Sequence, residues 1–199
     1  MAADTKTRIL EAARALFNAE GYAGLSAMDV ATALAISPGH LYYHFKGKSE
    51  IAAALLAAHE AEMAGLLAQA RLACASRDVE TLWTQVHILI EETFDVRFAY
   101  RDGYLEPALR PGLARLRSSA IAALNAILSD LAQRGRLTAG PEAVSGLAQA
   151  IALGLAHQAP ALELEGRTEP PRALIARAAA LVMLPTAGYA AAAKKKPKR

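Results

Sequence analysis

The residues from 36 to 50, ISPGHLYYHFKGKSE, combine the side-chain types that contact nucleic acid. Two tyrosines, two histidines and two lysines offer hydroxyl groups, aromatic faces and positive charge to phosphates or base edges. Leu41 and Phe45 lie four residues apart, so on a helix they share one face and can pack inward. The pattern therefore favours a short helix with one packed face and one face built to touch a partner.

Local signals define where this short helix begins. Ser37 is a good N-cap, and Pro38 fits the first helical position. Ser37 and Gly39 would leave backbone N–H groups free for an anion. Lys46 and Lys48 flank the start of the next helix, where a further phosphate contact is expected.

Metal binding and catalysis are the alternatives to this reading. His40 and His44 have the four-residue spacing of a helical metal-ligand pair, but no third ligand is near and Glu50 is poorly placed. Cys74 has no neighbouring His, and no serine lies in a Gly-x-Ser-x-Gly context. No phosphate-binding loop is present either. We expect no metal, no cofactor and no enzymatic activity.

Bulk composition indicates an all-α protein. Hydrophobic residues make up 54% of the 199 residues, and helix-forming Ala and Leu dominate them. The net charge is +3, but the terminal KKKPKR carries five of the 22 basic residues. Without it, 17 basic residues face 19 acidic ones, so nucleic-acid binding must rest on local arrangement.

The lone Cys74 excludes an intrachain disulfide and fits a reducing compartment. The start, MAADTKTRIL, lacks the basic-then-apolar order of a signal peptide, and we read no membrane-spanning helix. A soluble cytoplasmic protein is expected.

Helical periodicity divides the chain into two unequal parts. Helices in TKTRILEAARALFNAEGY, 5–22, and LSAMDVATALAIS, 25–37, precede the short third helix, and this plan is typical of a helix-turn-helix. A long fourth helix from Lys48 to about Cys74 leads into a bundle of roughly six helices. We predict a helix-turn-helix domain over 1–50, a larger helical domain over 51–189 and a disordered basic tail over 190–199; the family resemblance given next implies effector binding and dimerisation for 51–189.

The N-terminal pattern resembles the DNA-binding domain of the tetracycline-repressor-like (TetR) transcriptional regulators. The family usually carries Gly where this chain has Ala35, so an altered turn is expected there. The segment FAYRD, 98–102, is similar to a Phe-x-Tyr-Arg-Asp element in one branch of the family. The N-terminal resemblance rests on Ile9, Leu10, Ala12, Ala13, Leu16, Phe17, Gly21, Ser26, Asp29, Val30, Ala31, Ser37, Gly39, Leu41, Tyr42, His44, Phe45 and Lys48.

The resemblance implies an Ω-like homodimer, with two bundles packed through their last two helices and a DNA-binding head on each. Gly39, His40 and Tyr43 are the residues expected to contact base edges or methyl groups in the major groove. The residues expected at phosphates are Ser26, Ser37, Tyr42, His44, Lys46 and Lys48.

An effector pocket within the bundle is expected for a small, largely apolar ligand. For each aromatic residue or histidine taken alone, ordinary core packing is the favoured interpretation. Together, the resemblance and the Ala-rich helices favour a pocket lined by Trp83, His87, Phe94, Phe98, Tyr104 and His157.

A stripe of small residues at Gly146, Ala150 and Gly154 predicts a close helix approach. A palindromic operator needs two heads, so we place the dimer interface along this helix and the last one. Packing within one chain is the alternative. The predicted interface residues are Leu147, Ala150, Ile151, Gly154, Leu155, Leu174, Ala178 and Leu181.

The sequence thus predicts a homodimeric transcriptional regulator of double-stranded DNA, a repressor released from a palindromic operator by its effector. A DNA-binding regulator or architectural protein without an effector is the first alternative. A helical module that binds partner proteins and no DNA is the second. KKKPKR matches a nuclear import signal, but a solvated tail that adds nonspecific DNA affinity fits this fold better.

Overall fold

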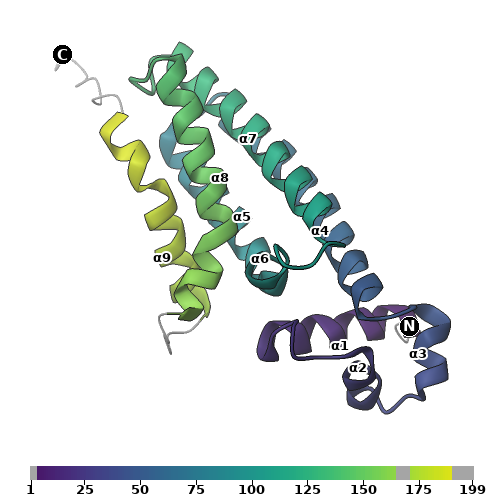
Figure 1. Cartoon of the computed structure of the whole chain (residues 1–199). Helices are drawn as coiled ribbons and strands as arrows, with labels where there is room; N and C mark the ends of the chain where they lie inside the picture. Colours follow the sequence, from purple (N-terminus) through teal and green to yellow (C-terminus); the bar gives the residue numbers. More distant parts are fainter. Residues whose placement is uncertain (1–3, 165–170, 190–199) are drawn as a thin grey trace, which may run out of the picture.

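The computed structural model describes residues 4–164 and 171–189, and they are helical, with no β-strand among them. The first three helices form a head at one end, and the later helices form an elongated bundle above it (Figure 1). This confirms the all-α prediction. The predicted basic tail lies outside the described residues.

The head consists of α1 (Thr5–Glu20), α2 (Ala27–Ala33) and α3 (Pro38–His44). Each contributes apolar residues at helical spacing to one small core. The side chains of Phe17, Val30 and Leu41 are fully or almost fully buried there, and Phe45 closes the core just after α3. The packing fixes α3 against α2 at the edge of the molecule.

The long α4 (Lys48–Cys74) leaves the head and continues into the bundle as one unbroken helix (Figure 1). It is long and apolar enough to cross a membrane by length and composition alone. Here it packs against α1, α5 and α7, and Ile51, Leu56 and Leu67 are buried in these contacts. We therefore interpret α4 as a core helix that links the two parts of the fold.

The bundle is completed by α5 (Val79–Asp95), α7 (Arg110–Gln133), α8 (Pro141–Leu164) and α9 (Pro171–Met183). A 3₁₀ turn, Leu184–Tyr189, follows α9. The short α6 (Arg97–Asp102) lies at the base of the bundle, between α8 and the head helix α1 (Figure 1). It is therefore placed to connect bundle and head.

Candidate nucleic-acid interface

The helix α3 is built by the signals that its sequence carries. The Ser37 hydroxyl accepts a hydrogen bond from the His40 backbone N–H at 3.2 Å, and Pro38 occupies the first turn. Leu41 is 1% exposed and Phe45 is 3% exposed, so this side of α3 is packed. The polar side is left outward, as the spacing predicted.

The outward side of α3 is aromatic and open. The Tyr43 side chain is 83% exposed and Tyr42 is 49% exposed, a large fraction for tyrosines with no core role. The rings of His40 and His44 lie 5.5 Å apart, and Tyr43 meets His44 edge-on at 5.1 Å. A Cβ on Gly39 would touch nothing within 4 Å, so a partner can approach the backbone closely there.

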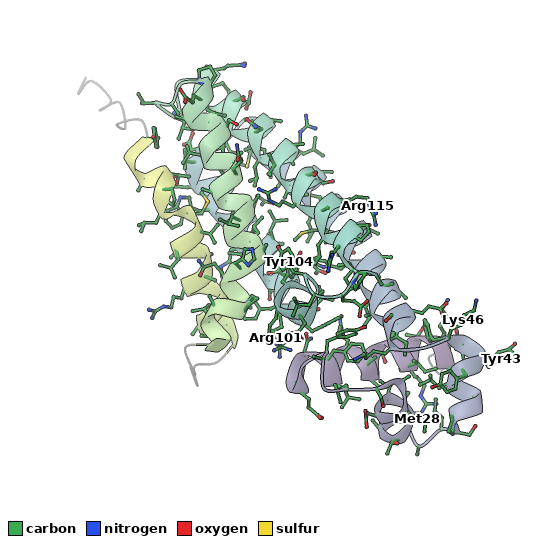
Figure 2. The ribbon with its side chains drawn as sticks, in the orientation of Figure 1. Met28, Tyr43, Lys46, Arg101, Tyr104 and Arg115 are labelled. Atoms are coloured by element: carbon green, nitrogen blue, oxygen red, sulfur yellow. The ribbon has the colours of Figure 1, made fainter. Side chains whose placement is uncertain are left out.

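Three labelled residues mark this surface in Figure 2. Tyr43 on α3 and Lys46 just beyond it point outward at the end of the head, with Met28 of α2 exposed nearby (Figure 2). The exposed Lys46 side chain brings positive charge to the same edge. Aromatic faces, hydroxyls and a cation on a protruding short helix can contact phosphates and base edges in a DNA groove.

The turn between α2 and α3 contains a strained residue. Ala35 has φ +52°, which lies in the left-handed region that favours glycine. The family resemblance pointed to this position, where glycine is usual. The turn keeps its left-handed backbone in spite of the alanine side chain.

Two of the predicted phosphate contacts also have local structural roles. The Ser26 hydroxyl caps α2, and it lies 2.7 Å from an Asp29 carboxylate oxygen, to which it donates. These hydrogen bonds lower the pKa of Asp29. The Lys48 ammonium donates to the Tyr22 carbonyl at 2.9 Å and lies 4.3 Å from the centre of the Tyr22 ring. Lys48 thus ties the start of α4 to the α1–α2 loop, a role that its sequence context did not reveal.

An aromatic cluster joins the head to the bundle. Phe98 of α6 lies 5.2 Å from the Phe17 ring and stacks on Tyr22 at 6.3 Å. Phe98 is completely buried, and its backbone N–H donates to Asn18 Oδ1 at 3.1 Å. The Asn18 amide in turn donates to the Asp95 carbonyl at 2.8 Å.

The neighbouring polar residues of α6 form hydrogen bonds to the head beside this aromatic cluster. We call this contact region between α6 and the head the joint. The Arg101 guanidinium donates to the Phe17 carbonyl at 3.0 Å, at the end of α1 (Figure 2). The Asp102 carboxylate accepts the Tyr22 backbone N–H at 2.9 Å. The Phe-x-Tyr-Arg-Asp element was noted in the sequence without a role, and these contacts show that it connects α6 to the head.

A buried histidine was missed by sequence reasoning. His59 is 3% exposed, with Nε2 2.8 Å from the Tyr100 hydroxyl and Nδ1 3.1 Å from Glu92 Oε1. Burial lowers the pKa of His59 to about 4, so its imidazole is neutral at pH 7. The geometry fits Nδ1–H donating to Glu92 and Nε2 accepting from Tyr100. The signal in the sequence was a histidine on the apolar face of a long helix.

Comparisons with known proteins agree with this geometry. Residues 9–55 match the family model described as "Bacterial regulatory proteins, tetR family". These residues belong to the TetR family. Over 52 residues the chain is 42% identical to the Escherichia coli K12 protein named HTH-type transcriptional regulator UidR. These 52 residues make up 26% of each chain. The alignment thus spans about a quarter of that curated relative.

Two solved structures extend the likeness to the bundle. A TetR-family transcriptional regulator from Marinobacter aquaeolei VT8 superposes with a TM-score of 0.78, at 25% identity, over 94% of this chain and 92% of that one. The SmeT–triclosan complex shares the fold, with a TM-score of 0.69, 20% identity and coverage of 98% and 99%. The TetR family consists of transcriptional regulators, which are not enzymes, and this confirms the non-enzymatic prediction.

The six predicted ligand residues do not meet in one pocket. Trp83 and His87 line a groove of about 350 Å³ between α5 and α9. Tyr104 lines a small cavity on the other side of α8 and stacks on His157 with ring centres 5.7 Å apart. Phe94 is half-buried against the core, and Phe98 belongs to the joint with the head. The single-pocket prediction is corrected accordingly, because the bundle separates these side chains on different helix faces.

The predicted dimer residues are mostly inside the protomer. Leu147, Ile151, Leu155 and Ala178 are all at most 5% exposed, packed in the core of their own chain. A Cβ on Gly154 would lie 2.6 Å from Val182 Cγ2, so this glycine serves the contact of α8 with α9. Leu174 is partly buried against the core, whereas Ala150 and Leu181 are exposed. Packing within one chain thus explains Gly154, whereas a Cβ on Gly146 would meet nothing within 4 Å and Ala150 is exposed.

Proposed function

We propose that this chain is a sequence-specific, DNA-binding transcriptional regulator that acts as a homodimer. The observation that carries the proposal is the outward face of α3, with an 83% exposed Tyr43 on a helix whose other side is locked in the core. In a helix-turn-helix this helix enters the major groove. From Ile9 onward, the head lies within the segment that matches the TetR family.

The roles of the α3 residues follow from their exposure. Gly39, His40 and Tyr43 face outward and are proposed to contact base edges and thymine methyl groups. Tyr42, His44 and Lys46 flank that face and are proposed to contact phosphates. Ser26 and Ser37 would contact phosphates beside their capping bonds, and Lys48 would do so only by leaving Tyr22.

The dimer is proposed to form through exposed positions of α8 and α9. Leu153 is 52% exposed, Leu181 is 44% exposed and Leu184 is 63% exposed, and Ala150 adds a small residue beside Leu153. Exposed leucines on two adjacent helices are the surface that a second copy can cover. Two heads held in this way would match a palindromic operator.

A repressor released by a small, largely apolar ligand is the proposed mode of regulation. Any ligand in the bundle that shifts α6 would strain the joint formed by Phe98, Arg101 and Asp102 with the head. DNA would then weaken ligand binding by the same factor, since coupling between two sites is reciprocal. SmeT, which shares this fold, was solved with triclosan, so the fold is able to hold a small molecule.

A regulator or architectural protein without an effector is the second candidate. The cavity beside Tyr104 offers only about 30 Å³, too little for most metabolites in this conformation. This closed state is expected either for a protein that has no effector or for the unliganded form of one that has.

The proposed regulator has three parts. These are a DNA-binding head over 1–50, a bundle over 51–189 that binds the effector and forms the dimer, and a basic tail over 190–199 that adds nonspecific DNA affinity. A cytoplasmic location is proposed because DNA is the partner.

Fluorescence anisotropy of the full chain on a pool of DNA duplexes, across a salt series, tests the function. Selective, salt-sensitive binding to a palindrome is expected. Weak binding that is indifferent to sequence would contradict the proposal and favour a protein-contact role for α3. Tyr43→Ala should remove the selectivity, whereas Leu105→Ala, an exposed position on the bundle, is the matched control.

A further inference from the structure

The cavity beside Tyr104 has apolar walls from four parts of the bundle. Met63 of α4, Leu113 and Leu116 of α7, and Leu155 of α8 are each at most 7% exposed and line it. Tyr100 of α6 also lines it, but its hydroxyl is hydrogen-bonded to His59. The interior therefore suits a hydrocarbon or aromatic body that needs no hydrogen bond.

The polar groups of this cavity gather at its mouth and favour an anion. Arg117 of α7 lines the cavity and is exposed, with no hydrogen bond or ion pair in the described part of the chain. The Tyr104 hydroxyl is a second donor at the mouth, 3.4 Å from His157 Nε2 on α8. No aspartate or glutamate lines the cavity. A cation without a partner beside an apolar space is matched by a negatively charged head on an apolar body.

Ligand entry requires movement of Tyr104. The cavity holds about 30 Å³, room for about two water molecules. Tyr104 is 47% exposed and lies in the turn after α6, so its side chain can swing outward without disturbing the core. The turn has no room for a side chain at Gly103, because a Cβ there would clash with the Ala99 carbonyl oxygen. Tyr104 lies two residues after Asp102, the last residue of α6.

We infer that this cavity binds an amphipathic carboxylate, with the carboxylate on Arg117 and Tyr104 and the apolar body between α4, α7 and α8. The inference rests on the ligand-responsive part of the proposed function and names the class of ligand. Arg117 would supply a charge-assisted, two-pronged hydrogen bond, which is about twice as strong as a neutral one. The ligand would select the conformation in which Tyr104 is swung out.

Calorimetry of the full chain with octanoate, octanamide and octylammonium tests the inference. These probes share one apolar body and differ in the charge of the head. Octanoate is expected to bind at least about tenfold more tightly than octanamide, with octylammonium weakest. Arg117→Gln should abolish the preference for octanoate and leave octanamide binding unchanged. Arg71→Gln, which removes an exposed arginine from α4, should keep the preference.

The inference would be overturned by equal affinity for octanoate and octanamide, or by a preference that survives Arg117→Gln. Absence of binding by all three probes would overturn it as well. Ala156→Leu fills the cavity and should weaken octanoate and octanamide alike. Anisotropy on DNA without any probe separates the two proposals, because DNA binding without octanoate binding would reject only the ligand class. Octanoate binding without DNA binding would reject only the regulator.

Discussion

The hydroxyl of Tyr22 donates a hydrogen bond to Glu106 Oε2 at 2.9 Å, from the loop after α1 to the turn that leads into α7. The same hydroxyl lies 3.2 Å from the Ser49 hydroxyl at the start of α4. One side chain in the head thus contacts both the start of α4 and the turn before α7. Burial raises the pKa of Tyr22 to about 12, so the phenol stays protonated and remains a donor.

Tyr22→Phe should lower the free energy of unfolding by about 1 kcal/mol, because it removes the hydroxyl and leaves both partners unsatisfied. Urea unfolding measures the change. Tyr43→Phe is the matched control, since Tyr43 is 83% exposed, and it should shift stability by less than about 0.5 kcal/mol. Equal effects of the two variants would mean that the joint contributes nothing to stability.

Ala35→Gly should raise the free energy of unfolding by about 1 kcal/mol. A left-handed backbone at φ +52° costs an alanine about that much relative to glycine. Ala33→Gly, two residues earlier in α2, should instead lower stability by up to about 1 kcal/mol, because glycine is a poor helix former. If the turn is strained as described, thermal unfolding should show a higher stability for Ala35→Gly and a lower stability for Ala33→Gly.

Tyr42→Phe should weaken binding to all DNA sequences by a similar factor of a few-fold, because a phosphate contact carries no base information. His40→Ala should instead change the order of preferred sequences. Anisotropy on a small set of operator variants separates the two effects. A change of preference in Tyr42→Phe would reassign its hydroxyl to a base.

Leu155→Glu should destabilise the protomer itself by about 3 kcal/mol or more, because Leu155 is 4% exposed and a carboxylate would be buried. Leu153 lies on the exposed side of the same helix. Leu153→Glu should therefore lower protomer stability by less than about 0.5 kcal/mol, but it should dissociate the dimer. Sedimentation velocity and thermal unfolding of both variants provide the test. A folded, dimeric Leu153→Glu protein would place the interface elsewhere.

Folding stability should fall as pH drops from 6.5 toward 4. Burial lowers the folded-state pKa of His59 to about 4, so the unfolded chain takes up its proton first in that window. The loss should be on the order of 2 kcal/mol, reduced because burial raises the pKa of Glu92, whose contribution has the opposite sign. His59→Gln, which does not titrate, should flatten the slope of stability against pH between 6.5 and 4.

The head was predictable because its determinants are local. Ser26 with Asp29, Ser37 with Pro38, and the spacing of Leu41 and Phe45 each act within a few residues, and the structure confirms all three. Helix caps and helical periodicity depend on near neighbours only, so they can be read without knowing the rest of the fold.

The bundle was predictable only in outline. Helical periodicity shows that a face is apolar, but the same pattern serves packing within a chain and packing between chains. For that reason the residues around Leu155 were assigned to a dimer, whereas the structure buries Leu155 in the core of its own protomer and packs Gly154 against α9. The six aromatic and histidine residues were grouped by type, and the packing of five long helices placed them in separate regions.

By itself the sequence determined the all-α class, the helix-turn-helix head and the face of α3 that points outward, because these follow from interactions a few residues apart. Only the tertiary structure decided that Phe98, Arg101 and Asp102 join the head to the bundle, and that Arg117 and Tyr104 share a cavity mouth. These pairings span many residues and depend on how helices cross, which no local pattern encodes.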